Sequence, residues 1–411
     1  MLQRGDSRCC FTTNRFSGFL ASRKTAKAVS GLSLARDTRL KQGVNDMRVV
    51  DLKIEDIAFG GKGVGREKGK AVFVPYTIEG ETVSAEILRE KKQFAEAELV
   101  EVKESSRHRV TPECSYFGHC GGCAYQHIDY EHQLAIKWRQ VRNVLQRIGK
   151  LNDIPLRPII PSPKQYEYRN RITVHVQDGV TGFFRRDSHR LVDIEGCPIS
   201  CDEVNRALTE LRERNPRNGH YTLRTSSSRR VFSQTNTEVA DALRDLIVDL
   251  VPPNQDLLID AYCGAGFFAK ALLDRFRRVV GIDWDKFAIA AAKENATEKE
   301  TYIAGDVEEE LRQAGAVHPN RPPVNDVESG RVRSIAPTTV IIDPPAIGLS
   351  ANARKAIVNL APTTLIYVSC NPATLARDLK ELQEKFTIHS LTPLDMFPQT
   401  AEIEAVAHLQ P

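Results

Sequence analysis

The chain has 411 residues, a formal net charge of +4 and a hydrophobic content of 41%. This length can hold two or three domains, and the charge is too small to establish a polyanionic partner. No apolar run approaches the roughly 18 residues of a membrane helix, and none resembles a secretory signal, so we expect a cytoplasmic protein without a membrane span.

Residues 1–46 hold nine Lys and Arg residues against three Asp and Glu residues. They show no clear periodic pattern, and three interpretations stay open: a disordered basic tail, an organellar transit peptide, or sequence upstream of the true start. Met47 opens the first well-patterned segment. We therefore expect residues 1–46 to lie outside the fold.

Residues 47–105 alternate in short strands separated by Gly-rich and charged turns. This pattern predicts a small five-stranded barrel of the OB type. Such barrels hold single strands of nucleic acid or serve as structural caps, and the nearly balanced charge of this segment favours neither.

Residues 106–230 are expected to form a central α+β domain. A helical pattern covers residues 131–149, alternating strands follow over residues 167–200, and a second helical pattern covers residues 201–215. The stretch from Arg139 to Arg230 holds 18 basic and 10 acidic residues. This local surplus predicts a nucleic-acid-binding surface, with a merely solvated charged surface as the alternative.

Several of the nine cysteines cluster in this central segment. Cys114, Cys120 and Cys123 form a C-x5-C-x2-C motif with two glycines between the last pair. Such a cluster more often binds metal than forms disulfides when no secretory signal is present. Tetrahedral zinc or a [4Fe–4S] cluster needs a fourth thiolate, for which Cys197, followed by proline, competes with Cys201. The spacing fits an iron–sulfur cluster better than paired zinc knuckles, and a redox disulfide is the remaining alternative.

Strands alternate with helical patterns over residues 231–411, which predicts an α/β domain with a doubly wound, Rossmann-like parallel sheet. The Pro-rich residues 316–337 are expected to form a surface loop. In "DAYCGAGFF", Gly264 and Gly266 follow a strand and permit a tight turn close to a ligand. A GxG motif alone is a weak signal, because many nucleotide folds share it.

Acidic residues follow three further strands of this pattern: Asp283, Asp306 and Asp343. At the carboxyl edge of the sheet, the first can accept hydrogen bonds from ribose hydroxyls, and the second can lie beside an adenine. Helix capping explains one or two of these acids but hardly three. A dinucleotide dehydrogenase is the rival interpretation, but it would normally show G-x-G-x-x-G. Cys370 follows an apolar run and should emerge at the same edge, unless it is a structural thiol.

Together, these motifs resemble the RNA (uracil-C5)-methyltransferases that use S-adenosylmethionine, within them the iron–sulfur-containing 23S ribosomal RNA type with an N-terminal TRAM barrel. The resemblance runs from about Met47 to Val406. It rests on the joint order of "CSYFGHCGGCAYQH", "GCP", "FSQTN", "DAYCGAGFF", "DPP", "SCNPATLARDL" and "DMFPQTAEIE". It implies a class I methyltransferase domain over residues 231–411.

The resemblance also implies roles for individual residues. Four cysteines look like the ligands of a [4Fe–4S] cluster: Cys114, Cys120, Cys123 and Cys197. Six residues look like part of the S-adenosylmethionine site: Gln234, Tyr262, Phe267, Asp283, Asp306 and Asp343. Cys370 is similar to the family's nucleophile and Glu404 to its general base, with Glu402 as a nearby second carboxylate.

This chemistry explains why a thiol and a carboxylate are needed. C5 of uracil is a poor nucleophile, and addition of a thiolate to C6 raises the electron density on C5. After methylation, a base removes the C5 proton so that the thiol can leave. The target uridine must first leave its stack. The predicted cluster is expected to staple the central domain rather than to perform redox chemistry.

One departure from the family pattern is Ala346 in "DPPAIG", where arginine is frequent. Arg354 or Arg377 could supply the missing cation. The expected substrate is ribosomal RNA, with a transfer RNA T-loop uridine as the alternative. A non-catalytic RNA-binding or assembly protein is the rival from another class, and an iron–sulfur oxidoreductase would need a hydride-transfer site that the sequence does not show. We expect a monomer.

Overall fold

The computed structural model describes residues 48–186, 188–226, 234–315 and 338–411. The described residues belong to one folded unit that spans Met47–Pro411. The expectations for residues 1–46 and for the loop 316–337 fall outside the described residues. No described helix has both the length and the apolar character that crossing a membrane requires.

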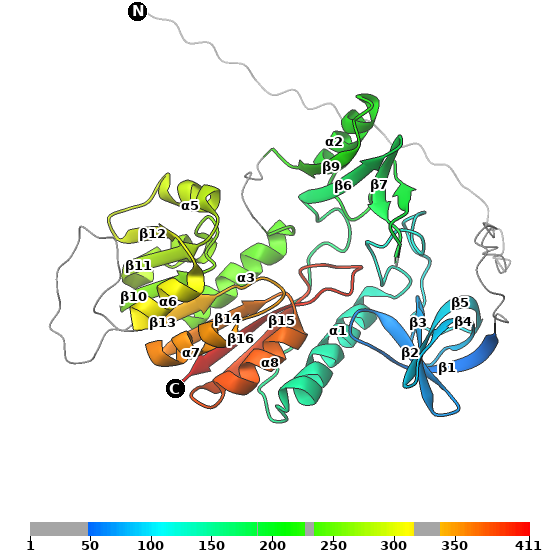
Figure 1. The fold of residues 1–411 in the computed structure, drawn as a ribbon, viewed down its shortest axis with the longest axis horizontal. Helices are drawn as coiled ribbons and strands as arrows, with labels where there is room; N and C mark the ends of the chain where they lie inside the picture. The colour runs from blue at the N-terminus through cyan, green and yellow to red at the C-terminus, as the bar shows by residue number, and fades with distance from the viewer. Residues whose placement is uncertain (1–47, 187, 227–233, 316–337) are drawn as a thin grey trace, which may run out of the picture. The chain divides into compact units, whose positions relative to one another are not determined.

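The first five strands close into a small barrel, which confirms the predicted architecture (Figure 1). The order around the barrel is β1-β2-β3-β5-β4, with β3 and β5 paired in parallel. Its core is made of aliphatic side chains that alternate with exposed ones, as a half-buried strand requires. The strands are β1 (Val49–Ile57), β2 (Lys62–Glu67), β3 (Lys70–Pro75), β4 (Thr82–Glu90) and β5 (Phe94–Glu104).

The central part combines a four-stranded antiparallel sheet, in the order β8-β7-β6-β9, with helix α2. Val204 and Leu208 of α2 pack on Ile172 and Val174 of the sheet. The elements are α1 (Tyr130–Val144), η1 (Leu145–Gly149), β6 (Arg171–Gln177), β7 (Val180–Phe184), β8 (Leu191–Asp193), α2 (Asp202–Glu213) and β9 (Gly219–Arg224). Helix α1 packs elsewhere, because its last turn joins a core cluster of the C-terminal sheet.

The C-terminal part is a seven-stranded sheet in the order β12-β11-β10-β13-β14-β16-β15. Strands β10 to β14 are parallel, and β16 inserts antiparallel between β14 and β15. This confirms the Rossmann-like prediction. The strands are β10 (Gln255–Ala261), β11 (Phe276–Asp283), β12 (Glu300–Ala304), β13 (Thr339–Ile342), β14 (Thr364–Ser369), β15 (Thr387–Leu394) and β16 (Glu404–Gln410).

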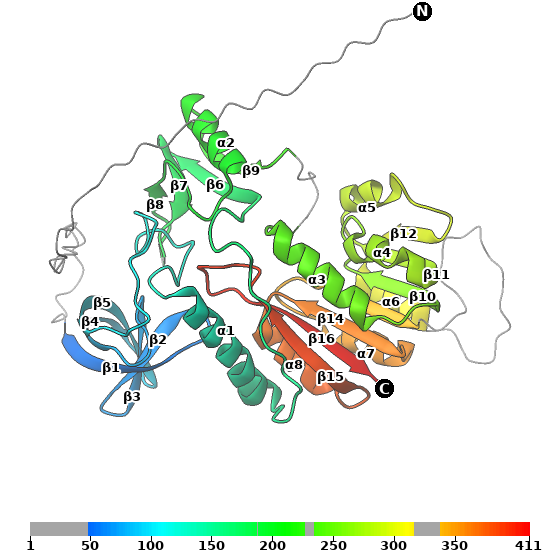
Figure 2. The same ribbon diagram turned by 180° about the vertical axis from the view of Figure 1, so that it is seen from behind.

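Helices cover both faces of this sheet. Alternate side chains of β10 enter opposite clusters, since Leu257 and Ile259 face one core and Leu258 the other. The first core also takes side chains from α6, α7, α8 and α1, and the second from α3, α4 and α5 (Figures 1 and 2). The helices are α3 (Thr237–Leu250), α4 (Phe267–Ala271), η2 (Leu273–Arg275), α5 (Lys286–Lys293), α6 (Val307–Gly315), α7 (Ala351–Leu360) and α8 (Pro372–Leu382).

Candidate functional site

The glycine turn after β10 lies at the switch point of the sheet, where neighbouring strands lead away in opposite directions and where such folds bind ligands. Gly264 and Gly266 have φ values of 54° and 81°. A Cβ atom on Gly266 would lie 2.7 Å from the hydroxyl of Tyr302. The backbone N–H of Gly264 donates to Asp283 Oδ2 at 2.8 Å. The turn is therefore built for glycine and braced by the acid that ends the next strand.

The other predicted donor-site residues lie in different local settings. Tyr262 has a φ of 64°, and its pKa is raised to about 12 by burial and then by nearby carboxylates. Phe267 begins α4 with 39% of its surface exposed. Asp306 is exposed and accepts from the N–H of Glu309 at 2.9 Å. It therefore caps α6, which is the alternative role that the sequence left open for one or two of these acids. Gln234 lies just before α3, and its carbonyl accepts from Asn170.

Cys370 directly follows β14, and Glu404 begins the neighbouring antiparallel strand β16. Ser369 of β14 pairs with Ala405 of β16, so the next step of the register sets Cys370 opposite Glu404. Directly opposite residues have Cβ atoms about 5 Å apart. Cys370 is half-buried, whereas Glu404 keeps only 3% of its surface exposed. Glu402 is exposed, so Glu404 is the carboxylate that faces the thiol from within the protein.

The electrostatics of this pair follow from burial among acids. The pKa of Cys370 is raised to about 12 by burial, then by Glu404 and by Asp343. The pKa of Glu404 is raised well above its usual value by burial, then by Asp343 and Glu402. Burial and Asp283 raise the pKa of Asp343 as well. The site therefore favours neutral groups, and a positive charge placed beside these acids would favour their ionised forms.

Ala346 lies in the loop that follows Asp343, and two side chains of the α8 N-terminus bind its carbonyl. Asn371 Nδ2 donates to it at 3.0 Å and Thr374 Oγ1 at 3.1 Å. Arg354 is committed to Asp378 and Glu381, and Arg377 to Asp378 and to carbonyls of the same loop. Both arginines thus hold the loop in place and are paired with carboxylates.

Asp260 is a site residue that sequence reasoning missed. It is fully buried in β10, and its Oδ2 accepts from the N–H of Ala269 at 2.8 Å, which fixes the start of α4. Burial raises the pKa of Asp260 to about 8. A carboxylate inside the apolar run "DLLIDA" was the signal that could have identified it.

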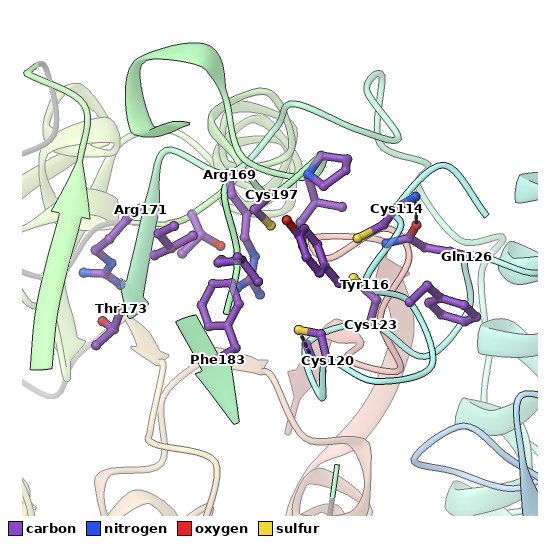
Figure 3. A pocket seen from close by; sticks show the side chains of 18 residues that line it. Cys114, Tyr116, Cys120, Cys123, Gln126, Arg169, Arg171, Thr173, Phe183 and Cys197 are labelled. Carbon is purple, nitrogen blue, oxygen red and sulfur yellow. Dashed lines mark hydrogen bonds between the residues drawn. The ribbon is translucent and has the colours of Figure 1, made fainter. Parts of the chain in front are cut away.

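Four cysteines from two distant segments line one cavity of about 390 Å³, here called the cysteine cavity (Figure 3). Three come from the loop before α1 and one from the turn before α2: Cys114, Cys120, Cys123 and Cys197. Among the described residues that line it, the competitor Cys201 does not occur. Burial raises the pKa of Cys120 to about 11 and that of Cys123 to about 12. Within the described ranges, no three His, Cys, Asp or Glu side chains converge tightly enough to ligate a single metal ion as they stand.

The loop of the cysteine cavity docks on β7 through a glycine. The N–H of Gly121 donates to the carbonyl of Phe184 at 2.9 Å, and Cys120 forms a β-bridge with Arg185. A Cβ atom on Gly121 would lie 3.0 Å from the carbonyl oxygen of Phe184 and 3.1 Å from the nitrogen of Arg186. A larger residue at this position would require the neighbouring backbone to shift by a few tenths of an ångström.

Arginines gather beside the cysteine cavity. Arg169 and Arg171 line it, and Arg171 pairs across the sheet with Arg224. Like charges directly opposite each other are destabilising in a sheet. The pKa of Arg171 is lowered by burial and then by Arg224 and Arg169. Arg169 and Arg171 thus bring positively charged side chains to the wall of the cysteine cavity.

Comparison with known proteins matches the chain to two family models. The model described as tRNA (Uracil-5-)-methyltransferase matches residues 210–410, and the TRAM domain model matches residues 45–100.

Similar whole proteins carry RNA methyltransferase names. An uncharacterized RNA methyltransferase of Bdellovibrio bacteriovorus is 30% identical over 390 residues, which cover 88% of this chain and 95% of that protein. Another from Protochlamydia amoebophila is 30% identical over 88% of this chain and 97% of its own length. Among solved structures, the Pyrococcus abyssi tRNA (uracil-54, C5)-methyltransferase in complex with S-adenosyl-L-homocysteine has the same fold. It is 24% identical, with a TM-score of 0.65, and the match covers 88% of this chain and all of that one.

The closed N-terminal barrel, the Rossmann-like sheet and these full-length relatives lead to one assignment. The chain is an RNA methyltransferase that belongs to the uracil-5 methyltransferase family and carries an N-terminal TRAM domain.

Proposed function

We propose that this protein transfers a methyl group from S-adenosylmethionine to C5 of a uridine in 23S ribosomal RNA, through a covalent bond between Cys370 and C6 of the base. The observation that carries this proposal is the strand register that sets buried Glu404 opposite Cys370. Asp343 lies close enough to both to raise the pKa of each. The proposed nucleophile and the proposed base would thus share one edge of the sheet with the glycine turn.

The two side chains perform separate steps. Cys370 Sγ, as the thiolate, adds to C6 of the uracil ring and pushes electron density to C5. S-adenosylmethionine, when bound, would supply an electrophilic methyl group on a positively charged sulfur. C5 then forms a bond to the methyl carbon, the methyl–sulfur bond breaks, and S-adenosylhomocysteine leaves with the electron pair. Glu404 then takes the proton from C5, the C6–sulfur bond breaks, and the electron pair of the C5–H bond restores the double bond while Cys370 leaves.

Different residues of the chain are proposed to bind different parts of the methyl donor. Gly264 and Gly266 leave room for a ligand close to the backbone, and Asp283 accepts hydrogen bonds as a ribose partner requires. The remaining proposed contacts come from Gln234, Tyr262, Phe267, Asp306 and Asp343. The last of these offers a negative charge to the donor's positive sulfur.

The cysteine cavity fits a [4Fe–4S] cluster bound by Cys114, Cys120, Cys123 and Cys197. Four thiols line one space, and two glycines bring the backbone close to it. When bound, the cluster would supply a structural cross-link between two distant segments.

Gly121→Ala tests this cluster without touching a cysteine. The new Cβ must displace the backbone of β7, at a cost of about 1–3 kcal/mol, and Cys120 moves with it. We expect less iron and acid-labile sulfide per chain after anaerobic purification. The matched control is Gly196→Ala beside Cys197, whose Cβ meets nothing closer than Asn205 Oδ1 at 3.8 Å. Equal iron in both variants and the wild type would contradict the assignment.

The rate of methyl transfer should rise with pH. Cys370 and Glu404 both act in their deprotonated forms, and burial raises the pKa of both. Deprotonation therefore increases as the pH rises through neutrality, and single-turnover rates should climb from about pH 6 to pH 9. RNA affinity measured at each pH serves as the control. A flat or falling profile with constant RNA binding is incompatible with this assignment.

Ribosomal RNA is the first candidate substrate because the four cysteines resemble those of the iron–sulfur-containing ribosomal RNA type, and we propose that the arginines beside the cysteine cavity contribute to RNA binding. We accordingly propose a TRAM barrel over residues 47–105, a central RNA-binding domain over residues 106–230 and a methyltransferase domain over residues 231–411. A tRNA T-loop uridine is the second candidate, favoured by the description of the matching family and by the fold of the Pyrococcus abyssi enzyme.

Mass spectrometry of nucleosides, mapped by position in 23S rRNA and in tRNA, tests the substrate in cells with and without the gene. We expect 5-methyluridine to disappear from one position of 23S rRNA when the gene is deleted. Loss from the T-loop instead would support the second candidate. An unchanged pattern in both RNAs would overturn the substrate assignment.

A further inference from the structure

The loop of residues 395–403, which joins β15 to β16, leads directly into Glu404. It is buried along most of its length, with Asp395 and Met396 fully covered and Gln399 and Thr400 nearly so. Surface loops are normally exposed, because their polar backbone needs water. Here the backbone and side chains find partners on α1 and on the segments that line the cysteine cavity.

Gln399 makes the densest set of these contacts. Its carbonyl accepts from the N–H groups of Ala124 and Tyr125, both at 2.9 Å, and Cys123 of the cysteine cavity directly precedes them. Its side-chain Oε1 accepts from Gln133 Nε2 at 2.9 Å, and its N–H donates to Gln133 Oε1 at 3.2 Å. The residue has a φ of 67°, a left-handed conformation that a non-glycine residue keeps only when its surroundings hold it.

Two further attachments act on neighbouring residues of the loop. Lys137 of α1 is fully buried and donates to Asp395 Oδ1 at 2.6 Å and to the carbonyl of Phe397 at 3.0 Å. Arg169, which lines the cysteine cavity, holds its guanidinium 5.8 Å from the centre of the Phe397 ring. The loop is thus tied at three successive points to the two segments that build the cysteine cavity and to the helix between them.

We propose that these contacts position Glu404 for proton removal from C5, with Gln133 and Gln399 as positioning residues. The inference rests on the proposed role of Glu404 as the base. Four residues lie between Gln399 and Glu404, so a displacement of the loop at Gln399 is passed on to the carboxylate. A displacement of about 1 Å at a reacting group can cost about 100-fold in rate. The cysteine segment therefore sets the geometry of the second chemical step.

Two variants loosen the loop. One of them, Gln133→Met, also removes the hydrogen bonds from Gln133 Nε2 to the carbonyls of Tyr125 and Ile128. Gln399→Gly removes the side-chain pair with Gln133, and glycine adopts the left-handed φ without strain. Gln133→Met removes the same pair from the other side with little change of volume. The matched control is Gln140→Met on the same helix. Gln140 is equally buried and also donates three hydrogen bonds, but to Ile57, Ala58 and Tyr125 rather than to the loop.

The readout is the amount of RNA that stays covalently bound to the protein after denaturation, together with melting temperature, RNA affinity and the rates of methyl incorporation and product release. We expect Gln399→Gly and Gln133→Met to slow release about 10-fold and to accumulate methylated adduct, as Glu404→Gln should. Methyl incorporation and RNA affinity should stay near wild type. Gln140→Met should keep the wild-type adduct level even where its melting temperature falls.

The outcomes distinguish a failure of the positioning role from a failure of the proposed role of Glu404 as the base. Adduct in Glu404→Gln but not in the two loop variants overturns the positioning role alone. If Gln133→Met and Gln140→Met lose methyl transfer and product release equally, Gln133 has a merely structural role. That outcome also overturns the positioning role. No adduct in any variant, Glu404→Gln included, overturns the assignment of the base and the positioning role together.

Discussion

Replacing Cys370 with alanine is expected to lower the rate of methyl transfer by at least about 10⁴-fold, because the variant has no group that can add to C6. Binding of RNA and of the methyl donor should persist, since alanine changes neither the glycine turn nor the arginines. The thiol is neutral at rest, with a pKa raised to about 12, so alanine removes no charge that the fold depends on. Methyl incorporation into RNA measures the effect.

A second measurement identifies the bond itself. RNA that carries 5-fluorouridine has no proton at C5 for the base to remove, so the wild-type protein should remain covalently attached to it. Peptide mapping should locate the attachment at Cys370. Cys201→Ala is the matched control, because Cys201 is a half-buried cysteine that lines neither the sheet edge nor the cysteine cavity. Full adduct formation by Cys370→Ala would refute the proposed nucleophile.

Replacing Glu404 with glutamine is expected to slow turnover by about 10²–10⁴-fold while methyl transfer to C5 still occurs. The methylated RNA should stay attached to Cys370, because no base removes the C5 proton. Glutamine has nearly the same shape and no charge. Since burial raises the pKa of Glu404, an ionised carboxylate at that position destabilises the fold above the ordinary glutamate pKa, and the neutral variant avoids that penalty. Denatured gels of the protein–RNA adduct measure the effect.

Glu402→Gln provides the control for this experiment. Glu402 lies two residues earlier in the chain and is exposed, whereas Glu404 is buried opposite Cys370. The control should release its product at close to the wild-type rate. If Glu402→Gln accumulates the adduct and Glu404→Gln does not, the base is Glu402 and the register argument fails.

Much of the fold could be predicted from local patterns. The strand alternation of residues 47–105 predicted a five-stranded barrel, and the alternation of strands and helices from residue 231 predicted the parallel sheet. Both predictions succeed because period-two and period-3.6 patterns record which side chains each element buries.

Some site residues were visible in the sequence and others were not. Asp283 and Cys370 follow apolar strands, so their position at the sheet edge could be predicted. Asp260 was marked only by its place inside an apolar run, and Gln399 could not be singled out at all. Asp260 matters because its carboxylate accepts from the N–H of Ala269. Gln399 matters because its carbonyl accepts from the N–H groups of Ala124 and Tyr125, which lie far away in the chain.

The sequence by itself determined the fold class, the acidic residues and the cysteine that follow successive strands, and the two cysteine segments. These features depend on neighbours along the chain. Only the tertiary structure decided that Glu404 faces Cys370, that Cys197 joins the three earlier cysteines, and that the loop before Glu404 rests on the cysteine segment. A shift of one residue in the pairing of β14 with β16 would turn Glu404 to the other face of the sheet. That register depends on packing between segments distant in sequence, which no local pattern encodes.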